Sequence, residues 1–166
     1  MKAIIIAAGI GSRLGDLTKD LPKPLVDVNG KSILQRQIEI FNKFGIDEII
    51  IIRGPHKEKF NFKNVTYVED TDVSNHDLLG SLMTAEKEMN DNMIISYGDI
   101  IFDENILSQI LSSPEHSTLA VDYDWQKNYQ YKSDILLDKV SVVTLENNSI
   151  IDVGYYENFQ NSKNLV

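Results

Sequence analysis

The first 25 residues, MKAIIIAAGIGSRLGDLTKDLPKPL, constrain the fold of this chain more than any other segment. The apolar run KAIIIA is short, unbroken and rich in β-branched residues, which is typical of a strand buried on both faces of a parallel sheet. Glycines then interrupt the run and predict a loop. A secretion signal would begin similarly, but Arg13 and Asp16 follow at once and the pattern downstream needs a first strand. We therefore predict a buried strand that leads into a loop.

Strand and helix patterns alternate along the rest of the chain. Ser32 is placed to cap a helix that extends to about Phe44, and Gly45 is placed to end it. The other predicted elements are strands at 47–54, 64–70, 92–99 and 117–125, helices at 78–88 and 104–111, and a hairpin at 139–156 around Glu146-Asn147-Asn148-Ser149. This order predicts a mostly parallel, mixed sheet with helices on both faces and a ligand site at the carboxyl ends of the strands.

The bulk composition limits the classes of function. A chain of 166 residues is long enough for one domain with a substantial core. Its formal net charge of −9 argues against nucleic acid as a partner, because such binding needs Lys and Arg to neutralise phosphates. No stretch approaches the ~20 apolar residues of a membrane span. The absence of cysteine excludes disulfides and thiolate catalysis, and we expect a cytoplasmic protein without a membrane partner.

The glycine-rich loop fits neither of two common nucleotide-binding motifs. A dinucleotide fingerprint has its third glycine one place earlier, and a Walker A loop needs glycine where Leu25 stands. Glycines still let backbone N–H groups cradle phosphate oxygens, and Arg13 adds a planar cation. Lys23 lies between Pro22 and Pro24, which should hold its backbone extended and aim its ammonium group. The alternative for Lys23 is a solvated side chain in a proline turn.

Two further loops carry polar side chains. Asp99 follows the predicted strand at 92–99, where a carboxylate can hold Mg²⁺ against a triphosphate, and the alternative role of helix cap is already filled by Asp103. In the loop before the helix at 78–88, Asn75 or Asp77 can act simply as a cap. The histidines at 56, 76 and 116 lie in separate loops, so we expect surface residues and no nucleophilic Ser/His/Asp arrangement.

The segment AAGIGSRLGDLTKDLPKPLVDVNGKSIL closely resembles the signature A-A-G-x-G-x-R-L…P-K-P-L…G of nucleotidyltransferases, which join a nucleoside triphosphate to a phosphorylated sugar or small alcohol. The resemblance implies a Rossmann-like, three-layer α/β/α fold. It also implies that Arg13 and Lys23 are catalytic cations, with Lys23 at the α-phosphate or at the phosphate that joins it, and that Asp99 binds Mg²⁺. The nucleotide-binding residues that it implies are Ala7, Ala8, Gly9, Gly11, Ser12, Arg13, Asn75, Ser81 and Gly98.

An Asn-containing loop followed by GSL and SYGD resembles the cytidylyltransferase branch, whose members act on phosphocholine, 2-aminoethylphosphonate and related compounds. The segment AVDYDWQKNY adds two carboxylates beside aromatic rings, which suits a small cation through ion pairing and cation–π attraction. We therefore predict CTP as donor, an amino-bearing phospho-compound as acceptor, and acceptor binding by Asp122, Asp124, Trp125 and Tyr129. The alternative for this segment is an aromatic cluster that closes the edge of the sheet.

The resemblance implies a single nucleotidyltransferase domain over residues 1–166. Family members usually continue for about 60–80 further residues, and we expect this chain to lack that part and the second metal-binding carboxylate within it. Three functions stay open: a cytidylyltransferase of cell-surface polysaccharide or phosphonate biosynthesis, a sugar-1-phosphate nucleotidyltransferase that uses UTP, dTTP or GTP, and a non-catalytic nucleotide-binding module. The oligomeric state, including a homodimer, stays open as well.

Overall fold

The computed structural model describes residues 1–9, 11, 15, 18–129 and 140–158 of the chain. It divides into two compact units, an amino-terminal unit of Met1–Ser108 and a carboxy-terminal unit of Gln109–Val166. Helix α3 (Glu104–Ser112) contains the boundary between them. Among the described residues, no helix combines the length and the hydropathy needed to cross a membrane.

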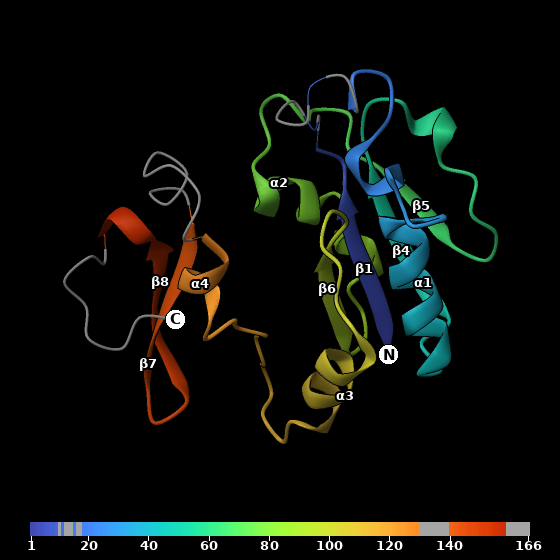
Figure 1. Ribbon diagram of the computed structural model, residues 1–166. Coiled ribbons are helices and arrows are strands. Elements are labelled where there is room, and N and C mark those ends of the chain that lie inside the picture. Colours follow the sequence, from blue (N-terminus) through green and yellow to red (C-terminus); the bar gives the residue numbers. More distant parts are fainter. Residues whose placement is uncertain (10, 12–14, 16–17, 130–139, 159–166) are drawn as a thin grey trace. The chain divides into compact units, whose positions relative to one another are not determined.

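A four-stranded parallel sheet forms the centre of the amino-terminal unit (Figure 1). Its strands, in spatial order, are β5 (Thr66–Glu69), β4 (Glu48–Arg53), β1 (Lys2–Ala7) and β6 (Met93–Tyr97). β1 lies between β4 and β6, so Ile4 pairs with Ile50 on one side and with Ile95 on the other. This central position accounts for the unbroken apolar run at the start of the sequence, and it confirms the predicted buried first strand.

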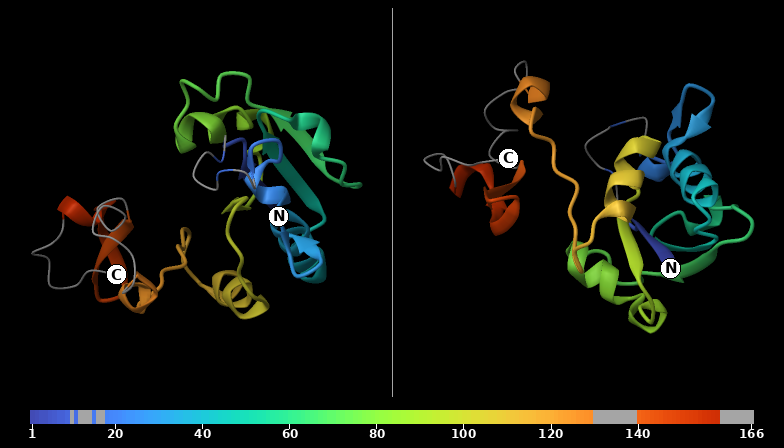
Figure 2. Two further views of the ribbon diagram at one scale, coloured as in Figure 1. Left: turned by 45° about the horizontal axis from the view of Figure 1, so that its top comes forward. Right: turned by 90° about the horizontal axis from the view of Figure 1, so that it is seen from below.

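Helices cover both faces of this sheet, and Figure 2 shows α1 (Ile33–Lys43) and α2 (Leu78–Met83) on opposite sides of β1. Successive strand residues point to opposite faces, so each strand contributes to two layers of core. On the side of α2, a cluster of Ile4, Ile6, Ala8, Ile50, Ile52 and Ala85 is buried with Leu82 packed against it. α1 buries Ile33, Leu34, Gln37, Ile38 and Phe41. The predicted three-layer α/β/α fold is confirmed.

Capping residues set the helix ends. Ser32 Oγ accepts a hydrogen bond from Gln35 N at 3.1 Å, and Asp103 Oδ1 accepts one from Ile106 N at 3.1 Å, as capping residues do. The single helix predicted over 78–88 is wrong, because α2 ends at Met83 and a separate 3₁₀ turn follows at Glu86–Glu88. Thr84 Oγ1 donates to Ser81 O at 2.7 Å, and such a side-chain bond competes with continuation of the helix.

A short turn carries Lys23 between the loop and α1. The predicted extended backbone at Lys23 is wrong, because Lys23–Leu25 form a 3₁₀ turn, η2. Leu25 N donates to Pro22 O at 2.8 Å and Val26 N donates to Lys23 O at 3.1 Å, so two hydrogen bonds stabilise the turn. The remaining short elements are the antiparallel pair β2 (Asp27–Val28) and β3 (Lys31–Ser32) and the 3₁₀ turn η3 (Lys57–Lys59).

The carboxy-terminal unit contains α4 (Trp125–Tyr129), the antiparallel strands β7 (Ser141–Glu146) and β8 (Ser149–Tyr155) and the 3₁₀ turn η5 (Tyr156–Asn158). The predicted hairpin is confirmed, with Asn147 and Asn148 both at positive φ in its turn. The strand predicted at 117–125 is wrong. Asp122 Oδ1 accepts from Asp124 N at 2.9 Å, and this local turn begins α4 where the pattern predicted extended chain.

Candidate active site

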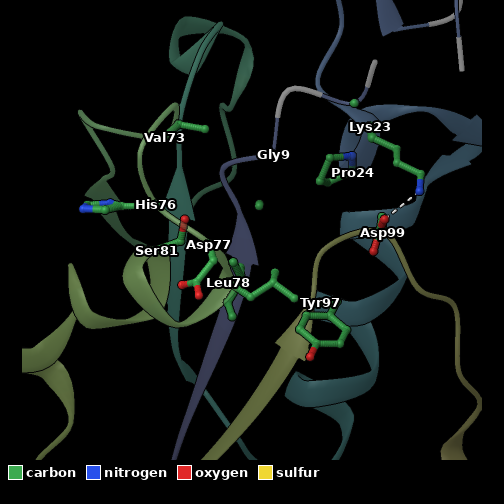
Figure 3. Close-up of a pocket in the computed structure, with 13 residues that line it drawn as sticks. Gly9, Lys23, Pro24, Val73, His76, Asp77, Leu78, Ser81, Tyr97 and Asp99 are labelled. Carbon is green, nitrogen blue, oxygen red and sulfur yellow. Dashed lines mark hydrogen bonds and ion pairs between the residues drawn. The ribbon is translucent and has the colours of Figure 1, made fainter. Parts of the chain in front are cut away.

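A pocket opens at the carboxyl end of the parallel sheet in the amino-terminal unit (Figure 3). Its volume is about 560 Å³. The loop after β1, the turn η2, the start of α2 and the end of β6 form its walls. The lining residues are Ile6, Ala7, Gly9, Gly11, Lys23, Pro24, Val73, His76, Asp77, Leu78, Ser81, Tyr97 and Asp99. The site therefore lies where the strand order predicts a ligand.

Lys23 and Asp99 form an ion pair on one wall of this pocket (Figure 3). Lys23 Nζ donates to Asp99 Oδ2 at 2.6 Å, although 76 positions separate the two residues in the sequence. Both side chains remain partly accessible, with 34% and 40% of their surfaces exposed. The structure thus brings together a cation and a carboxylate that the sequence predicts for the same reaction, and leaves both within reach of a ligand.

Gly98 allows this ion pair to form. A Cβ atom at this position would lie 2.9 Å from Pro24 Cγ and 3.0 Å from both Ala7 Cβ and Ile6 O. Without one, the turn that carries Lys23 packs directly on the end of β6, and Gly98 N donates to Ile6 O at 2.8 Å. Gly98 packs tightly here and is not among the residues that line the pocket, and its predicted contact with nucleotide stays a prediction.

The end of β1 and the loop after it supply three of the predicted nucleotide-binding residues to the pocket, namely Ala7, Gly9 and Gly11. Ala8 is buried, with 1% of its surface exposed, and packs in the core. Gly11 has a φ of +70°, and Thr18 Oγ1 donates to Gly11 O at 2.7 Å, so the loop is tied to the chain that follows it. Ser12 and Arg13 lie outside the described residues.

Asp70 is the centre of a hydrogen-bonded cluster on the opposite side of the pocket. Its side chain is fully buried, and it accepts hydrogen bonds from Ser81 Oγ at 2.6 Å and from Asp72 N at 3.0 Å. The ring of His76 completes the cluster, with Nδ1 at 2.9 Å from Asp70 Oδ1. The carboxylate lies between the serine and the histidine, so this is a structural cluster and not a nucleophile with its base. These hydrogen bonds connect the residue after β5 to the loop before α2 and to α2 itself.

The pKa of Asp70 lies below its ordinary value of 3.8. Burial by itself would raise it, but the hydrogen bonds from Ser81, from the Asp72 backbone and from His76 outweigh that effect. The ionised form therefore stabilises the folded chain at pH values above 3.8, and this contribution is lost as the pH falls through the lower pKa of the folded state.

We expect Asp70→Asn to lower the free energy of unfolding at pH 7 by about 1–3 kcal/mol, because an amide cannot accept all of these hydrogen bonds. The difference from the wild type should narrow below pH 3.8, where the wild-type carboxyl group becomes protonated too. Urea unfolding at several pH values measures this. Glu115→Gln removes the same charge from an exposed side chain and is the control. A difference in the free energy of unfolding between Asp70→Asn and the wild type that stays constant down to pH 2 would contradict the stabilising role of the Asp70 carboxylate.

The other predicted residues of this wall have different surroundings. Ser81 lines the pocket but donates its hydroxyl to Asp70, and Asn75 does not line the pocket and donates its amide to Asp72 Oδ1 at 2.6 Å. Asp77 caps α2 by accepting from Gly80 N at 2.8 Å, as the capping alternative predicted. Sequence reasoning missed His76, Leu78 and Tyr97 as lining residues. An exposed leucine or tyrosine carries no signal for a pocket until the fold is known.

The predicted acceptor-binding residues belong to the carboxy-terminal unit. Trp125 is buried, with 6% of its surface exposed, and its ring packs edge-on against Tyr156 with centroids 5.2 Å apart. Asp124 is exposed and pairs with Lys127 at 2.6 Å, while Asp122 holds the turn before α4. Tyr129 ends that helix, and its side chain lies outside the described part of the structure.

The pocket offers a divalent cation the carboxylate of Asp99. Mg²⁺ is usually held by one or two carboxylates together with substrate phosphates. Asp99 supplies such a carboxylate in the pocket that Gly9 and Gly11 also line, and among the described residues no group of three potential metal ligands occurs. The residues present therefore fit a cation that arrives with a nucleotide, and they do not form a site made of protein ligands alone.

Residues 3–138 match the family of MobA-like NTP transferase domains. The CTP:phosphoglutamine cytidylyltransferase of Campylobacter jejuni is 30% identical over 165 residues, which cover 93% of this chain and 65% of that protein. A UTP–glucose-1-phosphate uridylyltransferase of Haloferax volcanii is 27% identical over 143 residues, or 79% of this chain and 58% of that protein. The chain thus spans less than two thirds of the length of either relative.

One solved structure resembles the chain in both sequence and fold. It is that of the CTP:phosphocholine cytidylyltransferase of Streptococcus pneumoniae, which superposes with a TM-score of 0.56 and 38% identity. The match covers 59% of this chain and 44% of that one.

Proposed function

The chain belongs to the family of MobA-like NTP transferase domains, and on that premise we propose that it is a Mg²⁺-dependent cytidylyltransferase. It transfers CMP from CTP to a small phosphorylated or phosphonate acceptor and releases pyrophosphate. Relatives named for CTP and for phosphoglutamine or phosphocholine support this choice of donor and acceptor class.

The observation that carries the proposal is that the Lys23–Asp99 pair and the glycines of the loop after β1 line one pocket. Nucleotidyl transfer requires little covalent chemistry from the protein, because positioning and charge stabilisation supply most of the rate. A cation for phosphate oxygens and a carboxylate for a metal ion are the two charges that such a reaction needs, and here they lie 2.6 Å apart.

The reaction is an in-line displacement at the α-phosphorus of CTP. A phosphate or phosphonate oxygen of the acceptor forms the new P–O bond, and the bond to the oxygen that bridges to the β-phosphate breaks. The electron pair of that bond leaves with pyrophosphate. Gly9 and Gly11 leave room for the phosphates beside the backbone, and Lys23 donates hydrogen bonds to the α-phosphate as negative charge develops there.

Asp99 would hold the Mg²⁺ ion, which would supply positive charge to balance the negative charge of the triphosphate and of pyrophosphate. Arg13 is proposed as a second cation for the triphosphate. On the other wall, Ser81 and the residues around the start of α2 line the pocket, and they are our proposed contacts for the nucleoside. Asp122, Asp124, Trp125 and Tyr129 remain our proposed residues for an amino or trimethylammonium group on the acceptor.

A screen of donors and acceptors tests this proposal. We expect pyrophosphate release with CTP and Mg²⁺ when phosphocholine, 2-aminoethylphosphonate or phosphoglutamine is the acceptor, and little release with UTP, dTTP or GTP. Faster release with UTP or dTTP and glucose 1-phosphate would support the sugar-1-phosphate alternative, which the similarity to the Haloferax protein favours. CTP binding in calorimetry without pyrophosphate from any acceptor would support a binding module and contradict the enzyme.

A further inference from the structure

Gln37 is a buried polar residue on the inner face of α1. Its exposed fraction is 1%, and the residues buried around it on the same face are apolar. A buried amide is costly unless its hydrogen bonds are satisfied, so its partners indicate its role.

The partners of Gln37 all belong to β6 and to the turn that follows it. Gln37 Nε2 donates to Tyr97 O at 2.8 Å and to Ile100 O at 2.7 Å. Its Oε1 accepts from Ser96 Oγ at 3.0 Å. Only one orientation of the Gln37 side-chain amide satisfies all three partners, with the NH₂ group toward the two carbonyl oxygens and the amide oxygen toward the serine hydroxyl.

The two carbonyl groups stand at the ends of the turn that carries Asp99. Ile100 N approaches Tyr97 O at 3.5 Å, so residues 97–100 form a turn with a weak closing bond of its own. Gln37 holds both ends of this turn at shorter distances from a single NH₂ group. One helical turn further along α1, the ring of Phe41 packs on Phe102 with centroids 5.7 Å apart. α1 therefore contacts the segment around Asp99 at two points, through Gln37 and through Phe41.

We propose that Gln37 is a positioning residue for Asp99. By fixing the turn, it sets the direction of the carboxylate toward Lys23 and toward the cation that accompanies the nucleotide. This inference rests on the proposed function, in which Asp99 binds that cation. Residues that orient a metal-binding side chain from behind affect the affinity for the metal more than the affinity for the rest of the substrate.

A role confined to core packing makes a different prediction. A residue that only fills space would, when replaced by an apolar residue of equal size, change stability and leave the metal requirement unchanged. Gln37→Met keeps the volume and removes the donor. Gln37→Glu keeps the volume and the acceptor for Ser96, but it places an oxygen against the two carbonyl oxygens. The two variants remove the hydrogen bonds to the turn in different ways. If one of them fails to fold, the other still tests the proposal.

Two measurements on the full chain test the proposal. The first is the Mg²⁺ concentration that gives half-maximal pyrophosphate release at saturating CTP and acceptor. The second, which needs no turnover, is Mn²⁺ binding in the presence of cytidine 5′-(α,β-methylene)triphosphate, followed by electron paramagnetic resonance. We expect both Gln37 variants to raise the half-maximal Mg²⁺ concentration and the dissociation constant for Mn²⁺ by about 10–100-fold, with a smaller change in the KM for CTP. Ser96→Ala leaves in place both hydrogen bonds from Gln37 to the carbonyl groups, so it should raise the half-maximal Mg²⁺ concentration and the Mn²⁺ dissociation constant less.

The control is Ile51→Val, which trims a fully buried side chain of β4 and lowers stability without touching the turn. It should leave the metal requirement at the wild-type value. Gln37 variants that lower the Tm but match Ile51→Val in both metal measurements would overturn the proposal. A wild type that releases no pyrophosphate, but binds Mn²⁺ in a manner that depends on Gln37, would overturn the proposed function and leave this inference standing. A wild type that binds no Mn²⁺ would overturn both.

Discussion

Replacing Lys23 by alanine is expected to lower kcat/KM for pyrophosphate release by about 10²–10³-fold, the usual cost of removing one group that stabilises transition-state charge. The loss should fall mainly on kcat, because the ammonium group acts most strongly as charge develops on the α-phosphate. In the structure, Lys23 Nζ donates to Asp99 Oδ2 at 2.6 Å. Its removal also leaves that carboxylate without its cation, so the affinity for Mg²⁺ alone is expected to rise slightly.

Lys31→Ala is the matched control for this variant. Lys31 Nζ pairs with Glu39 Oε2 at the same distance of 2.6 Å, and Lys31 does not line the pocket. Steady-state kinetics of the wild type and both variants compare the loss of a lysine inside the pocket with the loss of one outside it. Equal rates for Lys23→Ala and Lys31→Ala would contradict the role assigned to Lys23.

Replacing Gly54 by alanine is expected to lower the stability of the fold strongly, to an extent similar to that of Asp70→Asn. Gly54 follows β4, and a Cβ atom there would lie 2.5 Å from Ala8 O and 2.9 Å from Val73 Cγ2. The closer contact is with backbone of the loop that leads to the pocket, so β4 or that loop must shift. Overpacking of this kind costs about 1–3 kcal/mol. For a chain of this length the Tm should fall by about 3–10 °C.

Gly9→Ala separates stability from binding. A Cβ atom at Gly9 would meet nothing within 4 Å, and Gly9 lines the pocket. We expect this variant to keep the wild-type Tm in differential scanning calorimetry while weakening CTP binding, because its methyl group enters the space for the phosphates. Equal Tm values for Gly54→Ala and Gly9→Ala would contradict the prediction for Gly54, since the backbone around it would then accommodate a Cβ atom without loss of stability.

Much of the fold was predictable because its signals are local. The apolar run of β1, the Ser32 cap and the paired asparagines of the hairpin turn each determine structure within a few residues. The errors occurred where a side chain competes with the backbone. Asp122 turns the chain at a predicted strand, and Thr84 interrupts a predicted helix. Periodicity of hydrophobic residues contains no information on such bonds.

The site was predictable only in part, for the same reason. Lys23 and Asp99 were found through their motifs, and the structure places them together. The cluster around Asp70 and the contacts of Gln37 join residues that are distant in the sequence or that look ordinary in it. A glutamine in an amphipathic helix reads as a surface residue until the neighbouring strand supplies its carbonyl partners.

The ion pair between Lys23 and Asp99 also selects what can enter the pocket. Each charge is balanced by the other, so in the proposed function a free anion that binds Lys23 would leave Asp99 without its cation, and a free cation that binds Asp99 would leave Lys23 without its anion. A nucleotide that carries its own metal ion replaces both partners at once. If the proposed function holds, the pair would therefore favour a complete metal–triphosphate complex over free phosphate, and the net charge of −9 would add to the discrimination against free anions.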